Sequence, residues 1–120
     1  MWRSICAMAC LAVFLLMPAS SAAPPSSPSQ LNCKIGPVTK TYGGTKWLVY
    51  SCDDNRTVVI VAAPGSPAMP FYFMFYPTKD GYHLYGEGTG NKDATDAAEH
   101  DLSALSEPDI TALIAETKRR

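Results

Sequence analysis

Histidine and carboxylate side chains are the groups in this sequence best suited to acid–base or metal chemistry. The two histidines are His83 and His100, and the acidic residues near them are Asp80, Glu87, Glu99 and Asp101. Such a group could bind zinc or transfer protons. The spacing matches no pattern of metal ligands, however, and both histidines also suit exposed positions, one on a strand and one on a helix. We therefore predict no metal ligand, cofactor or catalytic residue. A small metal-assisted or hydrolase-like enzyme using His83, His100 and these carboxylates is kept as an alternative.

A glycine-rich segment at residues 86–92 is the clearest local candidate for a binding loop. It contains Gly86, Gly88, Gly90 and Lys92, and it lies between an expected strand and an expected helix. Backbone N–H groups in such a position can hold an anion. The glycine spacing differs from the nucleotide-binding patterns, and glycines also serve connections that need a positive φ. The sequence leaves both interpretations open.

The first 22 residues have the features of a secretory signal peptide. Arg3 provides a positive charge, an apolar run of about 13 residues extends from Ile5 to Met17, and small residues surround Ala22. The run is shorter than the roughly 20 residues that span a bilayer. We therefore expect cleavage after Ala22, no stable membrane span after cleavage, and an exported protein, periplasmic or secreted. Residues 23–30 are rich in proline and serine and predict a flexible leader.

Two of the four cysteines, Cys33 and Cys52, remain after this cleavage. In an oxidising compartment two such cysteines most simply form one disulfide bond. The bond would close a loop of about 20 residues and contribute about 3 kcal/mol to a stability of roughly 5–10 kcal/mol. Asn55 lies a few residues later and begins an Asn-Arg-Thr glycosylation sequon, whose use depends on the organism.

These residues must be positioned by strands that extend from residue 31 to about residue 88. Turn residues separate runs of β-branched and aromatic side chains, of which 57–62 and 70–77 are the clearest. No repeat is visible along this part of the chain. The simplest arrangement is an antiparallel meander of about five strands.

Two helical patterns follow the strands. Apolar residues recur at helical spacing over 94–105 and again over 110–114, and Ser106 and Asp109 form a capping signal before the second helix. The sequence therefore predicts a single α+β domain over residues 31–120. In this domain the two short C-terminal helices pack on one face of the antiparallel meander.

The two cysteines also predict the register of the first hairpin. If Cys33 faces Cys52 across antiparallel strands, the turn is centred between Tyr42 and Gly43. In this register Ile35 pairs with Tyr50. We expect Trp47 and Val49 to share the opposite face with Val38.

Aromatic side chains are concentrated in the expected strands. In the run 70–77 three phenylalanines alternate with Tyr72, Met74 and Tyr76, so the two groups point to opposite faces. Two small helices can cover only one face of a five-stranded sheet. The candidate binding surface on the other face consists of Trp47, Tyr72, Met74 and Tyr76. The leader, the loop at 63–70 or a homodimer could cover that face instead.

Charge restricts the function further. The formal net charge of -1 argues against a nucleic-acid partner. Residues 23–79 carry five basic and two acidic groups, whereas residues 80–117 carry one basic and nine acidic groups. The composition best fits a small exported soluble protein, a non-enzymatic binding or inhibitor-like module. Its partner would be a protein or small ligand in the export compartment, and a cell-envelope structural protein is a further alternative.

Overall fold

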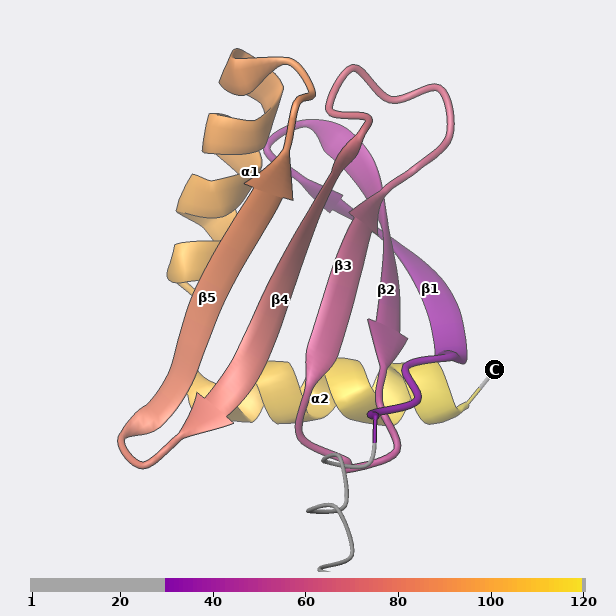
Figure 1. Ribbon diagram of the computed structural model, residues 1–120, viewed down its shortest axis with the longest axis vertical. Coiled ribbons are helices and arrows are strands. Elements are labelled where there is room, and N and C mark those ends of the chain that lie inside the picture. Colours follow the sequence, from indigo (N-terminus) through magenta and orange to yellow (C-terminus); the bar gives the residue numbers. More distant parts are fainter. Residues whose placement is uncertain (1–29, 120) are drawn as a thin grey trace, which may run out of the picture.

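The computed structural model describes residues 30–119. The expected signal peptide and nearly all of the leader lie outside the described residues. Five strands are followed by two helices (Figure 1). Their bounds are β1 Ile35–Tyr42, β2 Thr45–Ser51, β3 Val58–Ala62, β4 Phe71–Thr78, β5 Gly81–Gly88, α1 Lys92–Ser103 and α2 Glu107–Lys118.

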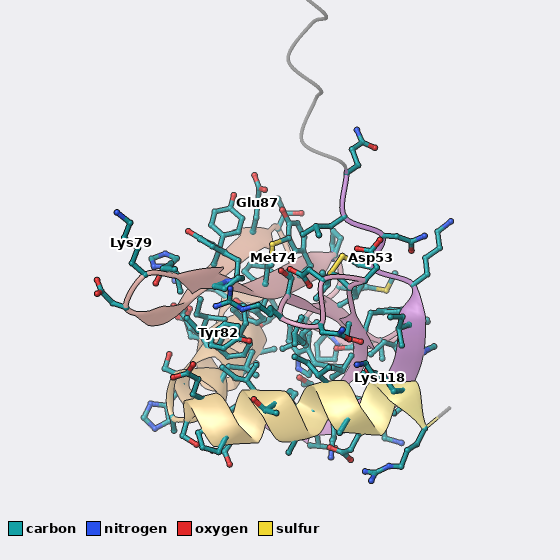
Figure 2. The ribbon with its side chains drawn as sticks, turned by 90° about the horizontal axis from the view of Figure 1, so that it is seen from below. Asp53, Met74, Lys79, Tyr82, Glu87 and Lys118 are labelled. Atoms are coloured by element: carbon teal, nitrogen blue, oxygen red, sulfur yellow. A yellow bond between two sulfur atoms is a disulfide. The ribbon has the colours of Figure 1, made fainter. Side chains whose placement is uncertain are left out.

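The strands form one antiparallel sheet in the order β1-β2-β3-β4-β5, which confirms the predicted five-stranded meander. Both helices lie on the same side of this sheet, and α2 runs across the strands (Figures 1 and 2). α2 contacts β1 and β2, whereas α1 contacts the two edge strands β1 and β5. The predicted α+β architecture, with the helices on one sheet face, is therefore the observed one.

The core lies between the sheet and the two helices. We call the helix-covered side of the sheet the inner face and the opposite side the outer face. Side chains alternate between these faces along each strand, as the pleat requires. The fully or nearly fully buried inner-face residues include Trp47, Val49, Val58, Ile60, Phe73 and Phe75, and they meet Leu102, Ile110, Leu113 and Ile114 from the helices.

The first hairpin differs from its predicted register. Tyr42 pairs with Thr45, so Gly43 and Gly44 form a two-residue turn with φ of 61° and 80°. Positive φ at both turn positions matches the twist of the strands, and glycine accepts it at low cost. An irregularity in β1 between Ile35 and Val38 shifts the pairing, and Ile35 lies opposite Ser51 instead of Tyr50. The expected turn centre was therefore wrong.

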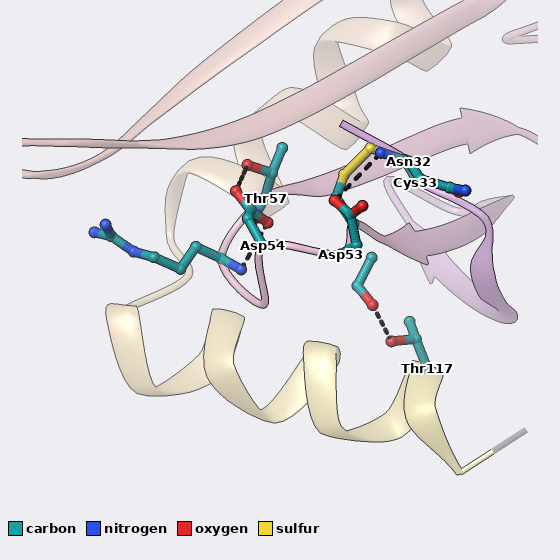
Figure 3. The surroundings of a disulfide bond; sticks show 9 residues. Asn32, Cys33, Asp53, Asp54, Thr57 and Thr117 are labelled. Carbon is teal, nitrogen blue, oxygen red and sulfur yellow. Dashed lines mark hydrogen bonds between the residues drawn. A yellow bond between two sulfur atoms is a disulfide. The ribbon is translucent and has the colours of Figure 1, made fainter. Parts of the chain in front are cut away.

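The disulfide bond between Cys33 and Cys52 is present (Figure 3). It joins the segment before β1 to the end of β2. Beside it, the Asp53 N–H donates to the Asn32 carbonyl oxygen at 2.8 Å, and the Asn32 N–H donates to Asp53 Oδ1 at 3.3 Å. The irregularity in β1 allows the disulfide and the two-residue turn to coexist in one hairpin. Asn55, the sequon residue, is exposed in the turn that follows.

Both helices begin at capping side chains. Ser106 and Asp109 form the predicted capping box of α2, in which each side chain accepts a hydrogen bond from the other residue's backbone N–H. Asn91 caps α1 by accepting from the Ala94 N–H at 3.1 Å. No helix within residues 30–119 is long and apolar enough to cross a membrane.

Candidate functional site

The outer face of the sheet carries no helix of the described chain, yet its strand positions are largely apolar or aromatic. The strand pairing places these side chains in rows across the sheet. One row contains Leu48, Val61, Tyr72 and Glu87, and the adjacent row contains Tyr50, Val59, Met74 and Tyr85. In Figure 2, Met74 and Glu87 lie on the side of the sheet away from α2, whereas Tyr82 lies on the helix side.

Several of these side chains remain exposed to solvent. Tyr76 is 37% exposed and Tyr85 is 41% exposed, and both are large aromatic residues. The neighbouring Val59, Val61, Tyr72 and Met74 are half-buried by one another. A contiguous apolar patch of this kind on a small domain is typical of a ligand or partner surface.

A hollow lies on the outer face of the sheet, next to the loop that joins β3 and β4. The hollow has a volume of about 580 Å³ and is lined chiefly by apolar side chains. Its walls include Val59, Val61, Met69, Pro70, Tyr72 and Glu87. This volume falls in the range of small-molecule sites, which are mostly apolar with a few oriented polar groups.

The polar residues that line this hollow are Tyr72, Glu87 and Thr89, and the Tyr85 phenol adjoins Glu87 on β5. Glu87 Oε2 accepts a hydrogen bond from the Tyr85 hydroxyl at 2.9 Å and another from the Tyr72 hydroxyl at 3.2 Å. The centroids of the two tyrosine rings lie 6.2 Å apart. β-Sheet geometry produces this cluster, because Tyr72 pairs directly with Glu87 and Tyr85 lies two residues before Glu87 on the same face.

The contacts within this cluster raise the pKa of both phenols above its ordinary value. The hydrogen bond to Glu87 is the largest cause that raises the pKa of Tyr85, with desolvation and the Glu87 charge adding to it. Desolvation and then the bond to Glu87 raise the pKa of Tyr72. At neutral pH the cluster therefore consists of two hydrogen-bond donors that converge on one acceptor oxygen.

Three of the four residues of the candidate surface lie together on one face of the sheet, and their binding role stays a prediction. Tyr72, Met74 and Tyr76 lie on the outer face, because β4 alternates in the predicted way. Trp47 does not belong to this surface. It is 0% exposed on the inner face, where it packs against Phe73 with ring centroids 5.2 Å apart. The same β2 alternation that was expected to pair Trp47 with Val49 places both in the core.

Sequence reasoning missed three important residues of the site: Tyr85, Glu87 and Met69. Period-two alternation along 81–88 was the available signal, since it places Tyr85 and Glu87 on one face of the last strand. That signal does not reveal which β4 residues lie opposite. The contribution of Met69 depends on the path of the β3–β4 loop, which no local pattern predicts.

The structure separates the two histidines. His83 is exposed on the outer face, where its ring lies 5.1 Å from that of Tyr76. His100 is exposed on α1, which covers the inner face. No group of three or more His, Cys, Asp or Glu side chains within residues 30–119 could hold a metal ion. The sheet therefore lies between the two residues of the alternative acid–base site.

The glycine-rich segment packs closely against the β3–β4 loop. The N–H groups of Thr89 and Gly90 both donate to the Pro70 carbonyl, at 2.9 and 3.1 Å, and the Asn91 N–H donates to the Pro67 carbonyl at 3.0 Å. A side chain at Gly90 would collide with the Ala68 backbone. The Lys92 ammonium bonds to Asp96, one turn later in α1. These contacts favour a packing role for the glycines over the anion-binding interpretation.

The fold and this site define a small α+β domain with an apolar, hollowed outer sheet face. No family model, curated protein or solved structure matches the chain.

Proposed function

We propose that the protein is a small, exported, non-enzymatic binding module that holds an apolar ligand on the outer face of its sheet. The observation that carries this proposal is the hollow of about 580 Å³ beside β3 and β4. An antiparallel sheet normally leaves a face uncovered only when that face is polar. Here the uncovered face is apolar, and burying part of it against a ligand would be favourable.

Two alternative functions, a small enzyme and a cell-envelope structural protein, have less support. An enzyme using His83 and His100 would require them to act on one substrate, but they lie on opposite sides of the sheet. Nothing in the described residues favours a structural role in a cell envelope over ligand binding. A second copy of the chain could instead occupy the outer face, and the experiment below can detect the resulting homodimer.

Export is supported by two independent features. The first is the signal-like segment before Ala22. The second is the disulfide between Cys33 and Cys52, a bond that persists mainly in oxidising compartments. Mass spectrometry of the protein recovered from its native compartment should show an N-terminus at Ala23 and a mass two units below that of the reduced chain. An intact N-terminus or two alkylatable thiols would contradict export.

The binding proposal can be tested with a neutral fluorescent probe, N-phenyl-1-naphthylamine, added to the purified processed protein. We expect saturable binding with one site per chain. The Met69→Gln variant should weaken it several-fold, because Met69 lines the hollow. Val61→Asp should weaken it more strongly, since it places a charge in the apolar wall.

Leu31→Gln is the matched control. Leu31 and Met69 are both large apolar residues with similar exposure, 48% and 49%, but Leu31 does not line the hollow. Equal probe binding by the Met69 and Leu31 variants would refute the proposed site. Self-association in analytical ultracentrifugation that excludes the probe would show that a second copy, instead of a ligand, occupies the face.

A further inference from the structure

The carboxylate of Glu87 is charged, exposed and only partly used within the chain. Both tyrosine hydroxyls donate to Oε2. Among residues 30–119, Oε1 has no hydrogen-bond partner and Glu87 takes part in no ion pair. One oxygen of a fixed carboxylate is therefore available to a ligand.

The Glu87 side chain, which carries the free Oε1 oxygen, lies at the apolar wall of the hollow. Glu87 lines the hollow together with Val61 and Met69, so an apolar wall stands beside the charge. Among the strand residues of the outer face, Glu87 is the one acidic side chain, and the one lysine is Lys46 on β2, three strands away. No cation of the described chain neutralises the carboxylate.

The two tyrosines add a second attraction for positive charge. Their hydroxyls both donate to the Glu87 carboxylate, and the centroids of the two rings lie 6.2 Å apart. The face of a phenol ring attracts ammonium groups. A carboxylate oriented by two donors also pays less entropy when it binds a cation than a freely rotating one does.

We propose that the ligand of the hollow is a small organic ammonium compound with an apolar body. The ammonium group binds Glu87 Oε1 beside the rings of Tyr72 and Tyr85, and the body lies against Val61 and Met69. This proposal rests on the proposed function, because it names the chemical class of ligand for the same hollow. The volume of about 580 Å³ suits a small molecule, so we choose a free amine over a lysine side chain of a protein partner.

The test compares two ligands of nearly equal shape, 4-phenylbutylamine and 4-phenylbutanol, as competitors of the neutral fluorescent probe at pH 7. The amine is cationic and the alcohol is neutral. We expect the amine to displace the probe about tenfold more effectively, as a charge-assisted contact predicts. In the Glu87→Gln variant this preference for the amine over the alcohol should disappear.

Glu107→Gln serves as the matched control, because it removes the same charge at the start of α2 on the helix-covered side. It should retain the tenfold preference. Thermal melting of each variant confirms that the fold is kept.

The outcomes separate the two proposals. Equal displacement by amine and alcohol in the unmodified protein would overturn the ammonium proposal and leave the binding function standing. A preference that persists in Glu87→Gln would overturn the role of Glu87. Absence of any saturable probe binding would overturn both proposals.

Discussion

Ser51 and Thr117 are joined by a hydrogen bond of 2.7 Å between their hydroxyl oxygens, and both residues are 0% exposed. The Thr117 hydroxyl also lies 2.6 Å from the Ile114 carbonyl oxygen, to which it donates. Since that uses the one proton of Thr117, Ser51 is the donor of the pair. This contact connects the end of β2 to the last turn of α2 (Figure 3).

Removing the Thr117 hydroxyl should reduce stability more than removing the Ser51 hydroxyl does. Thr117→Val keeps the side-chain shape but leaves Ser51 buried without its acceptor, so we expect a loss of about 1–3 kcal/mol. Ser51→Ala should cost less, about 1 kcal/mol, because Thr117 can still donate to Ile114. Urea denaturation of both variants and the double variant measures the coupling. Strictly additive losses would contradict the shared hydrogen bond.

Gly43 and Gly44 provide a second comparison, because both have positive φ but different surroundings. A methyl group at Gly43 would collide with the backbone of Ala97 and Ala98 in α1, whereas one at Gly44 would meet nothing. We expect Gly44→Ala to cost about 1 kcal/mol from its backbone conformation. Gly43→Ala should cost about 3 kcal/mol, since overpacking is added. Similar losses in denaturation would show that the hairpin tip does not dock on α1.

Asp54 should contribute to the loss of folding stability at low pH. Burial alone would raise its pKa, but hydrogen bonds from the Thr57 hydroxyl, the Thr57 N–H and the Arg56 N–H together lower it. A lowered folded-state pKa gives stability that is present above the unfolded-state pKa of about 4 and is lost as pH falls below it.

The Asp54→Asn variant tests this contribution. It should be less stable than the unmodified protein at neutral pH and should lose less stability between pH 5 and about pH 2. Urea midpoints measured across this range provide the comparison. Parallel pH profiles for the two proteins would contradict the role of Asp54.

The phenol–carboxylate cluster can be observed by tyrosine titration. Because Glu87 raises the pKa of Tyr85, the Glu87→Gln variant should titrate Tyr85 at lower pH. Burial, assisted by the charge of Glu116, raises the pKa of Tyr42 to about 12, and this residue should be unaffected. Ultraviolet absorbance of tyrosinate, with Tyr85→Phe to assign the shifted group, makes the measurement. An unchanged titration of Tyr85 would mean that the cluster does not form in solution.

The sequence predicted only part of the candidate site, because the remaining contacts depend on the register between neighbouring strands. Alternation along β4 correctly placed Tyr72 and Met74 opposite the phenylalanines, since side-chain direction in a strand has a period of two. Glu87 was visible only as a neighbour of glycines and histidines. Its bond to Tyr72 depends on the β4–β5 register, which joins residues 15 positions apart.

The sequence by itself determined the secondary structure, the antiparallel order, the disulfide pairing and the capping box at Ser106. These features depend on local periodicity, turn chemistry and the presence of two remaining cysteines. Only the tertiary structure decided that Trp47 is buried, that β1 is irregular beside Gly36, and that the β3–β4 loop forms one wall of the hollow. Each of these depends on contacts between segments distant in the chain. Such contacts are selected by packing of the whole molecule and leave little trace in any short stretch of sequence.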